Sequence, residues 1–154
     1  MGKALQKRIM QARFESPVQE SILNLLIAAN HIRQRLDRAC AEHGITHGQY
    51  NVLRILRGTP EGHARCEIAR RMLEKAPDVT RLIDRLEQTG LAERGRAEKD
   101  RRLSVSRITR KGINLLDRLQ PRIDEVYQYF AERVSLADRR ELSRICEGIY
   151  DEDE

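Results

Sequence analysis

The sequence predicts a mainly α-helical fold that carries one small β-hairpin. Apolar residues recur at intervals of three and four through most of the chain, and helix-capping residues precede several of these segments. Two strand-like segments, Leu91 to Arg96 and Leu103 to Ile108, flank a charged tip and interrupt the helical pattern once. With 154 residues, 40% of them hydrophobic, the chain can form one small domain with attached helices for oligomerisation.

The N-terminal part predicts one long amphipathic helix. Ser16 is a capping residue, Pro17 suits the first helical position, and Gln19 follows at the third. Gly44 is the expected end of this helix. The apolar stripe of the predicted helix consists of Ile22, Leu25, Leu26, Ala29, Ile32, Leu36, Ala39 and Cys40.

Three shorter helices are predicted in the centre of the chain. Thr46 to Gln49 form a capping-box pattern at the start of a helix that ends at Gly58, and a short helix follows around Glu67 to Leu73. A third helix begins near Ala76 or Pro77 and ends at Gly90. Its apolar face consists of Val79, Leu82, Ile83 and Leu86. Two helices followed by a basic hairpin form a winged helix-turn-helix, a fold whose main use is reading duplex DNA.

Two further helices are predicted after the hairpin. Thr109 caps the first, which Pro121 should kink into two halves, and Ser135 caps the second. Their apolar residues are Ile113, Leu116, Leu119, Ile123, Val126, Tyr127, Phe130, Val134, Leu142, Ile145, Cys146 and Ile149. Because one small domain offers these stripes little to pack against, we expect the first and last helices to form a two-fold dimer bundle. A monomer whose terminal helices wrap their own domain stays open as an alternative.

These predictions divide the chain into three parts. Residues 1–44 form an N-terminal arm and a dimerisation helix, 45–109 the winged helix-turn-helix, and 110–154 the C-terminal dimerisation helices with an acidic tail. The stretch from Arg65 to Lys111 contains 14 Lys and Arg against 8 Asp and Glu, a net charge of +6, whereas the rest has 15 against 16. The excess positive charge therefore lies on the predicted DNA-reading part, although a merely solvated charged face would show the same count.

Several classes of protein are disfavoured. No apolar run approaches the length of a membrane span, and no signal-type segment follows the basic N-terminus, so we expect a cytoplasmic protein. Cys40, Cys66 and Cys146 are scattered, which predicts neither a disulfide framework nor a zinc site. We expect no metal site and no cofactor. The chain contains no phosphate-binding loop, nucleophile elbow or HExxH motif, so an enzyme is not expected.

The central part of the chain resembles the MarR-type regulators of multiple antibiotic resistance. The resemblance covers about Leu36 to Leu116 and depends on the order and spacing of several short segments. These segments are Glu67-Ile68-Ala69, the run from Val79 to Glu87 with Gly90-Leu91, Asp100-Arg101-Arg102, and Ile108-Thr109 with Gly112. The resemblance implies a homodimeric transcription factor, usually a repressor, that leaves an inverted-repeat operator when a small aromatic or phenolic effector, or an oxidant, acts on it.

The resemblance also suggests which residues meet DNA. The third helix would enter the major groove, where Arg81 is the first candidate for a guanine contact, with Thr80 beside it. Asp78 could only accept a hydrogen bond, for example from a cytosine amino group. Arg102 would reach the minor groove, oriented by Asp100. The other candidate DNA contacts, mostly to phosphates, are Lys75, Arg85, Arg94, Arg96 and Arg101.

The sequence indicates less clearly how DNA binding would be regulated. A ligand pocket between the dimerisation helices and the helix-turn-helix is implied by the resemblance, with His31, Arg35 and Tyr50 as candidate polar groups. Two alternatives stay open, namely a winged helix that docks on another protein and a redox-sensing regulator that uses a cysteine. Cys66 is the candidate thiol because it adjoins Arg65 near a helix start, whereas Cys40 and Cys146 lie on apolar stripes.

Overall fold

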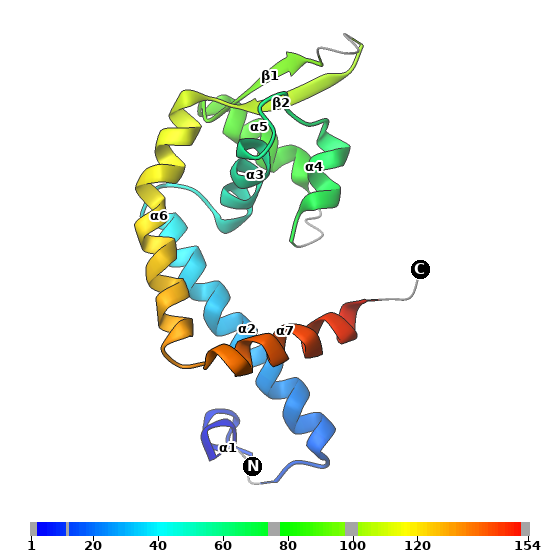
Figure 1. Ribbon diagram of the computed structural model, residues 1–154, viewed down its shortest axis with the longest axis vertical. Helices are drawn as coiled ribbons and strands as arrows, with labels where there is room; N and C mark the ends of the chain where they lie inside the picture. Colours follow the sequence, from blue (N-terminus) through cyan, green and yellow to red (C-terminus); the bar gives the residue numbers. More distant parts are fainter. Residues whose placement is uncertain (1–2, 12, 74–77, 98–101, 152–154) are drawn as a thin grey trace.

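The computed structural model describes residues 3–11, 13–73, 78–97 and 102–151 of the chain (Figure 1). It contains helices and a single two-stranded antiparallel sheet within these ranges, which confirms the predicted mainly α fold with a β-hairpin wing. In chain order the elements are α1 (Lys3–Ile9), α2 (Pro17–Ala41), α3 (His47–Arg57), α4 (Arg65–Arg71), α5 (Val79–Gln88), β1 (Ala92–Arg96), β2 (Ser104–Ile108), α6 (Arg110–Ala131) and α7 (Leu136–Tyr150).

Four predicted helix caps are present. The side chains of Ser16, Thr46, Thr109 and Ser135 each accept a hydrogen bond from the backbone N–H three residues further on. At Thr46 the capping box is complete, because Gln49 Oε1 also accepts from the Thr46 N–H at 2.9 Å. These bonds satisfy amide groups that the first turn of a helix otherwise leaves without a partner.

The start of α5 differs from the prediction. We expected the helix to begin near Ala76 or Pro77, both of which lie outside the described residues, but its first helical residue is Val79. Asp78 is the N-cap and accepts a hydrogen bond from the Arg81 N–H at 3.0 Å. The end agrees with the prediction, since Gly90 follows α5 with φ of +71°, a conformation that glycine adopts without strain.

The terminal segments contain one bend and one additional helix. Helix α6 continues through Pro121 as one element and follows a bowed path in Figure 1 instead of a straight one. A proline removes one backbone donor, a loss that the rest of this 22-residue helix tolerates. The short helix α1 has no counterpart in the prediction, because it offers no cap pattern and only Leu5 on it is buried.

The hairpin also forms backbone hydrogen bonds outside its own ladder, to the loop before α4. Ala92 pairs with Ile108 and Arg96 with Ser104 in the antiparallel register of β1 and β2. His63, in the loop before α4, forms an isolated bridge with Ser106, and the two backbone hydrogen bonds measure 3.1 and 2.9 Å. The loop that precedes α4 is therefore fixed to the strand that leads into α6.

A continuous core links the central helices to the ends of α2 and α6. Its fully buried side chains include Leu53 and Leu56 of α3, Ile83 and Leu86 of α5, and Leu119 of α6. Within the described chain, the N-terminal part of α2 and all of α7 contribute nothing to this core. Figure 1 shows these segments extending from the head formed by α3, α4, α5 and the hairpin.

Candidate nucleic-acid interface

The two faces of α5 have opposite character. Val79, Ile83 and Leu86 face the core, and this anchors the helix to α3 and α4. Thr80, Arg81 and Arg85 are exposed on the outer face, and the Arg81 side chain is 88% exposed. An anchored helix that presents arginines to solvent is able to contact phosphates and the edges of bases.

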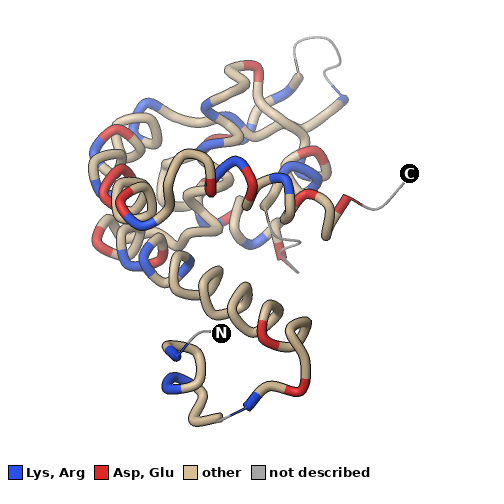
Figure 2. Tube along the Cα trace, turned by 60° about the horizontal axis from the view of Figure 1, so that its bottom comes forward, with Lys and Arg blue, Asp and Glu red and all other residues tan. Residues whose placement is uncertain are grey.

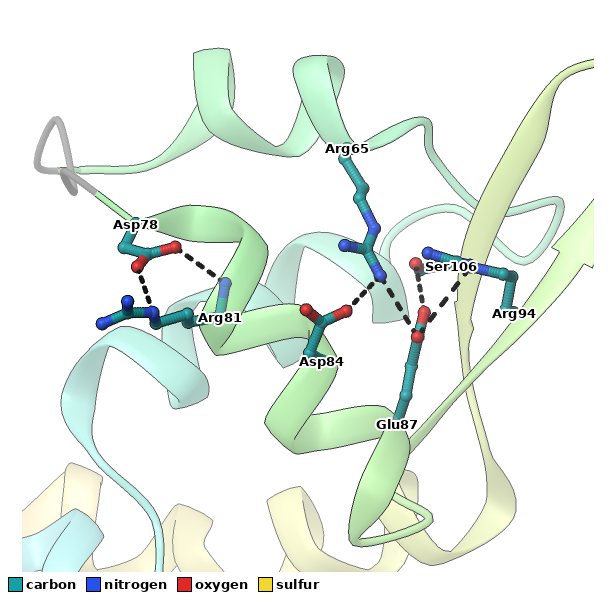
Figure 3. Close-up of polar contacts among 7 residues, drawn as sticks. All are labelled: Arg65, Asp78, Arg81, Asp84, Glu87, Arg94 and Ser106. Carbon is teal, nitrogen blue, oxygen red and sulfur yellow. Dashed lines mark hydrogen bonds and ion pairs between the residues drawn. The ribbon is translucent and has the colours of Figure 1, made fainter.

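Asp78 holds the first turn of α5 and its leading arginine together. In addition to capping the Arg81 N–H, its carboxylate forms an ion pair with Arg81 Nε, with Oδ2 and Nε 2.7 Å apart (Figure 3). Both oxygens of Asp78 are therefore engaged by Arg81. We had expected Asp78 to accept a hydrogen bond from a base, a prediction that stays untested; in this structure its contacts orient Arg81.

A polar network connects the opposite flank of α5 to the hairpin. Glu87 Oε2 accepts from Arg65 Nη2 at 3.2 Å, and Glu87 Oε1 accepts from the buried Ser106 Oγ at 2.9 Å. Arg94 Nε of β1 lies 4.0 Å from Glu87 Oε2. We call Arg65, Asp84, Glu87, Arg94 and Ser106 the Glu87 network (Figure 3). It ties the start of α4, the body of α5 and both strands to one partly buried carboxylate.

Asp84 belongs to this network. Asp84 lies close to Arg81 and Arg85 in the sequence, but its carboxylate accepts from Arg65 Nη2 at 2.5 Å. Arg65 is contributed by a different helix, and so proximity in the sequence gave no signal for it. The functional residues that sequence reasoning missed here are Arg65, Glu87 and Ser106, because their roles depend on contacts between elements.

The predicted wing residues lie on an exposed basic hairpin. Arg94, Arg96 and Arg102 are all exposed, and the Arg107 guanidinium braces the hairpin by donating to Arg96 O at 2.9 Å. Lys75, Asp100 and Arg101 lie outside the described residues. The structure thus places three of the predicted wing cations on one hairpin beside α5.

The three candidate effector residues do not share one site. Tyr50 lines a 300 Å³ cavity together with Arg54 of α3 and Tyr127 of α6. Burial raises the pKa of Tyr50, and the neighbouring Arg54 opposes this rise. The Tyr50 hydroxyl is buried, and no described residue, Arg54 included, forms a well-aligned hydrogen bond with it. His31 and Arg35 lie elsewhere, on the face of α2 that contacts Tyr129 of α6.

At that second place, aromatic and cationic groups stack. His31 Nε2 lies 3.0 Å from the Tyr129 hydroxyl, and Arg35 Nε donates to the same nitrogen at 3.3 Å. The guanidinium carbons of Arg35 and Arg133 lie 3.5 and 3.6 Å from the centroid of the Tyr129 ring. The contact of Arg35 with Tyr129 joins α2 to α6, whereas Arg133 covers the ring from the segment just after α6.

The cysteines occupy three different environments. Cys40 is fully buried in the core, and this burial, followed by the nearby Asp37 charge, raises its pKa to about 11. Cys66 is exposed and Cys146 is half-buried. In the described ranges no group of three His, Cys, Asp or Glu side chains could hold a metal ion, and no helix is long and apolar enough to cross a bilayer.

Comparison with known proteins places this architecture in one class. Residues 43–103 match the MarR family profile. The HTH-type transcriptional regulator PrsX of Escherichia coli is 33% identical over 107 residues, which cover 67% of this chain and 64% of PrsX. The chain thus spans just under two thirds of the length of PrsX. The homoprotocatechuate degradative operon repressor of Escherichia coli is 27% identical, over 68% of this chain and 70% of that one.

Solved structures agree with this assignment. A MarR transcription factor from Planctomyces limnophilus is 34% identical, with a TM-score of 0.66 over 88% of this chain and 98% of that one. CouR from Rhodococcus jostii RHA1, solved bound to p-coumaroyl-CoA, has the same fold at 20% identity, with a TM-score of 0.77 over 88% and 95% of the two chains. The MepR–DNA complex of S. aureus aligns at 23% identity and a TM-score of 0.73, over 85% and 96%. This chain belongs to the MarR family of transcriptional regulators, which are DNA-binding proteins and not enzymes.

Proposed function

We propose that this protein regulates transcription as a homodimer that binds an inverted-repeat operator in duplex DNA. The observation that supports this most directly is the outer face of α5, which presents Arg81 and Arg85 beside the exposed basic hairpin. Helix α5 enters the major groove, and the hairpin places Arg102 in the adjacent minor groove. The Glu87 network keeps these two elements at a fixed relative position.

The apolar surface of the terminal helices supports the dimer. A 530 Å³ groove between α2 and α7 is lined by Ile22, Leu25, Leu142, Ile145 and neighbouring residues, and these four side chains are exposed in the single chain. Residues 21–32 of α2 contain no Asp, Glu, Lys or Arg, and Figure 2 shows this stretch as an uncoloured run of the helix. An apolar face of this extent favours burial against a second copy.

The operator itself can be recovered without knowing the regulated genes. Selection of bound duplexes from a random pool, followed by titration at two salt concentrations, should enrich an inverted repeat with half-sites about one helical turn apart. Binding should weaken steeply with salt, because several phosphates are contacted. No enrichment, with only weak binding to any duplex, would contradict the proposal and favour a winged helix that docks on a protein.

Two arginine variants separate the roles of α5 and the hairpin. Arg81→Ala should relax specificity at one base position and cost about 1–3 kcal/mol there, whereas Arg102→Ala should weaken binding to most sites alike. Competition binding against operators with single base changes measures both effects. If Arg102→Ala bound every operator as tightly as the wild type, the assignment of the hairpin to the minor groove would be wrong.

We also propose that a small aromatic or phenolic effector binds in the Tyr50 cavity and so releases DNA. The specific support is the buried Tyr50 hydroxyl, with which no described residue forms a well-aligned hydrogen bond and which lies in a cavity that also contains Arg54 and Tyr127. An arginine beside a phenolic hydroxyl suits a ligand with an oxygen on an aromatic ring. A panel of phenolic acids should release the operator from wild type and much less from Tyr50→Phe; equal release from both would contradict this site.

A further inference from the structure

A second basic surface lies on the other flank of α5 from the Glu87 network. A 690 Å³ groove runs between α5, the loop that joins α2 to α3, and the first part of α6. Four cations line it, two from α5 and two from α6: Arg81, Arg85, Lys111 and Arg118. The buried apolar side chains of Ile45 and Leu115 also line it.

Arg81 pairs with Asp78, which lies outside the groove lining, but the other three cations of the groove have no carboxylate partner among the described residues. No Asp or Glu is present among the described residues that line it. Lys111 Nζ donates to Thr89 O at 2.7 Å, but the guanidinium groups of Arg85 and Arg118 contact no acceptor in the described chain. Further along α6 the situation is different, since Arg122 pairs with both Glu42 and Glu125. Cations gathered without carboxylates in a concave site attract an anion.

The position of the groove indicates which anion it would bind. Arg81 and Arg85 belong both to the groove and to the outer face of α5, so the groove opens onto the proposed DNA-binding surface. A helix in the major groove is bordered by a phosphate strand, and phosphate contacts position such a helix on the duplex. Thr46 and Gln49, at the N-terminus of α3, also line the groove.

We propose that this groove receives one strand of the DNA backbone, with Arg118 of α6 contacting a phosphate beyond those reached by α5 and the hairpin. This inference rests on the proposed DNA-binding function and extends its contact surface to a helix that otherwise connects the hairpin to the dimerisation part. Helix α6 thereby takes part in binding DNA as well as in joining the two parts of the chain.

The test is the salt dependence of binding to a long duplex of mixed sequence, with Arg118→Gln as the variant. Each phosphate contact contributes about 0.9 to the slope of log affinity against log salt. Because each of the two chains of the proposed dimer contributes one Arg118, Arg118→Gln should lower the slope by about 1.8, so that the loss of affinity between about 50 and 200 mM salt becomes roughly 12-fold smaller. Arg118→Lys should restore most of the slope, because it restores the positive charge.

The matched control is Arg122→Gln, one turn further along the same helix and outside the groove. It removes the same charge and should keep the wild-type slope. Lys111 is not used as the principal variant because its bond to Thr89 O also supports the end of α5. Thermal melting of each variant confirms that the fold is retained.

The outcomes are distinguishable. A wild-type slope for Arg118→Gln would overturn the inference and leave the proposed function intact. Loss of competition by inorganic phosphate in Arg118→Gln, with the DNA slope unchanged, would also overturn it, because the groove would then hold a small anion. A wild-type protein with no salt-dependent affinity for any duplex would contradict the proposed function itself.

Discussion

The head and the terminal helices of this protein differ in how far their apolar side chains are buried within one chain. In the head, Leu53, Leu56 and Leu86 are fully buried by contacts within the same chain. On the terminal helices, Ile145 is 47% exposed and Ile22 52% exposed, and α7 has no buried residue along its described length. The head therefore completes its own core within one chain, whereas the terminal helices leave apolar faces exposed that the proposed dimer would cover.

The largest effect is expected from a charge placed on the exposed apolar groove. Ile145→Glu should prevent dimer formation, since a carboxylate buried between apolar helices lacks a partner. Loss of the second head should weaken binding to an inverted repeat about 100-fold or more. Sedimentation and operator titration measure the two effects, and Ile145→Leu is the matched control. A dimeric Ile145→Glu variant would show that the dimer uses another surface.

A pair of alanine substitutions sharpens the contrast between the two regions. Leu56→Ala removes a side chain that is fully buried within one chain and should cost about 2–5 kcal/mol of stability at any protein concentration. Ile145→Ala should have a destabilising effect that depends on protein concentration, because the proposed dimer would bury this side chain. Urea unfolding at several protein concentrations distinguishes the two variants. If the stability of both depended equally on protein concentration, the proposed difference between the head and the terminal helices would be contradicted.

Within the head, substitution of Glu87 tests whether contacts with α5 stabilise the position of the hairpin. Glu87→Gln removes the charge that Arg65 and Arg94 share and should destabilise the fold by about 1–3 kcal/mol. Glu93→Gln, an equal charge change at an exposed position of β1, should have little effect on stability. Chemical unfolding of both variants checks this prediction. An equal loss of unfolding free energy in the two variants would mean that the Glu87 network does not stabilise the fold.

The smallest expected effect is the pH dependence of stability that arises from His63. Burial, aided by the Arg71 charge, lowers the pKa of His63 below its ordinary value of 6.5. The unfolded state therefore takes up a proton more readily, so stability is complete above pH 6.5 and falls as the pH drops through that value. Unfolding measured on both sides of this pH should show a weaker dependence in His63→Gln. The same change at His43, in the turn that follows α2, should leave the dependence in place.

Much of the fold was predictable because its determinants are local. Ser16, Thr46, Thr109 and Ser135 cap helices as their spacing indicated, and both strands begin within one residue of the predicted positions. Caps and turns depend on neighbours in the sequence, so their pattern can be read directly.

What could not be predicted depends on contacts between distant segments. The pairing of Arg65 with Asp84 and the bridge of His63 to Ser106 join residues about twenty or more positions apart, and no sequence pattern marks them. In the structure Asp78 caps α5 and pairs with Arg81, and its predicted contact with a base stays untested. The candidate effector residues were placed by resemblance, and the packing of α6 on α2 separates Tyr50 from His31.

The central claim is that terminal helices hold two DNA-reading heads at a fixed separation. The most direct test is a series of operators in which the spacing between the two half-sites changes by one base pair at a time. The account predicts strong binding at one spacing, a large loss when about half a helical turn is inserted, and an unchanged requirement in Ile145→Leu. Equal affinity at every spacing would contradict a rigidly held pair of heads.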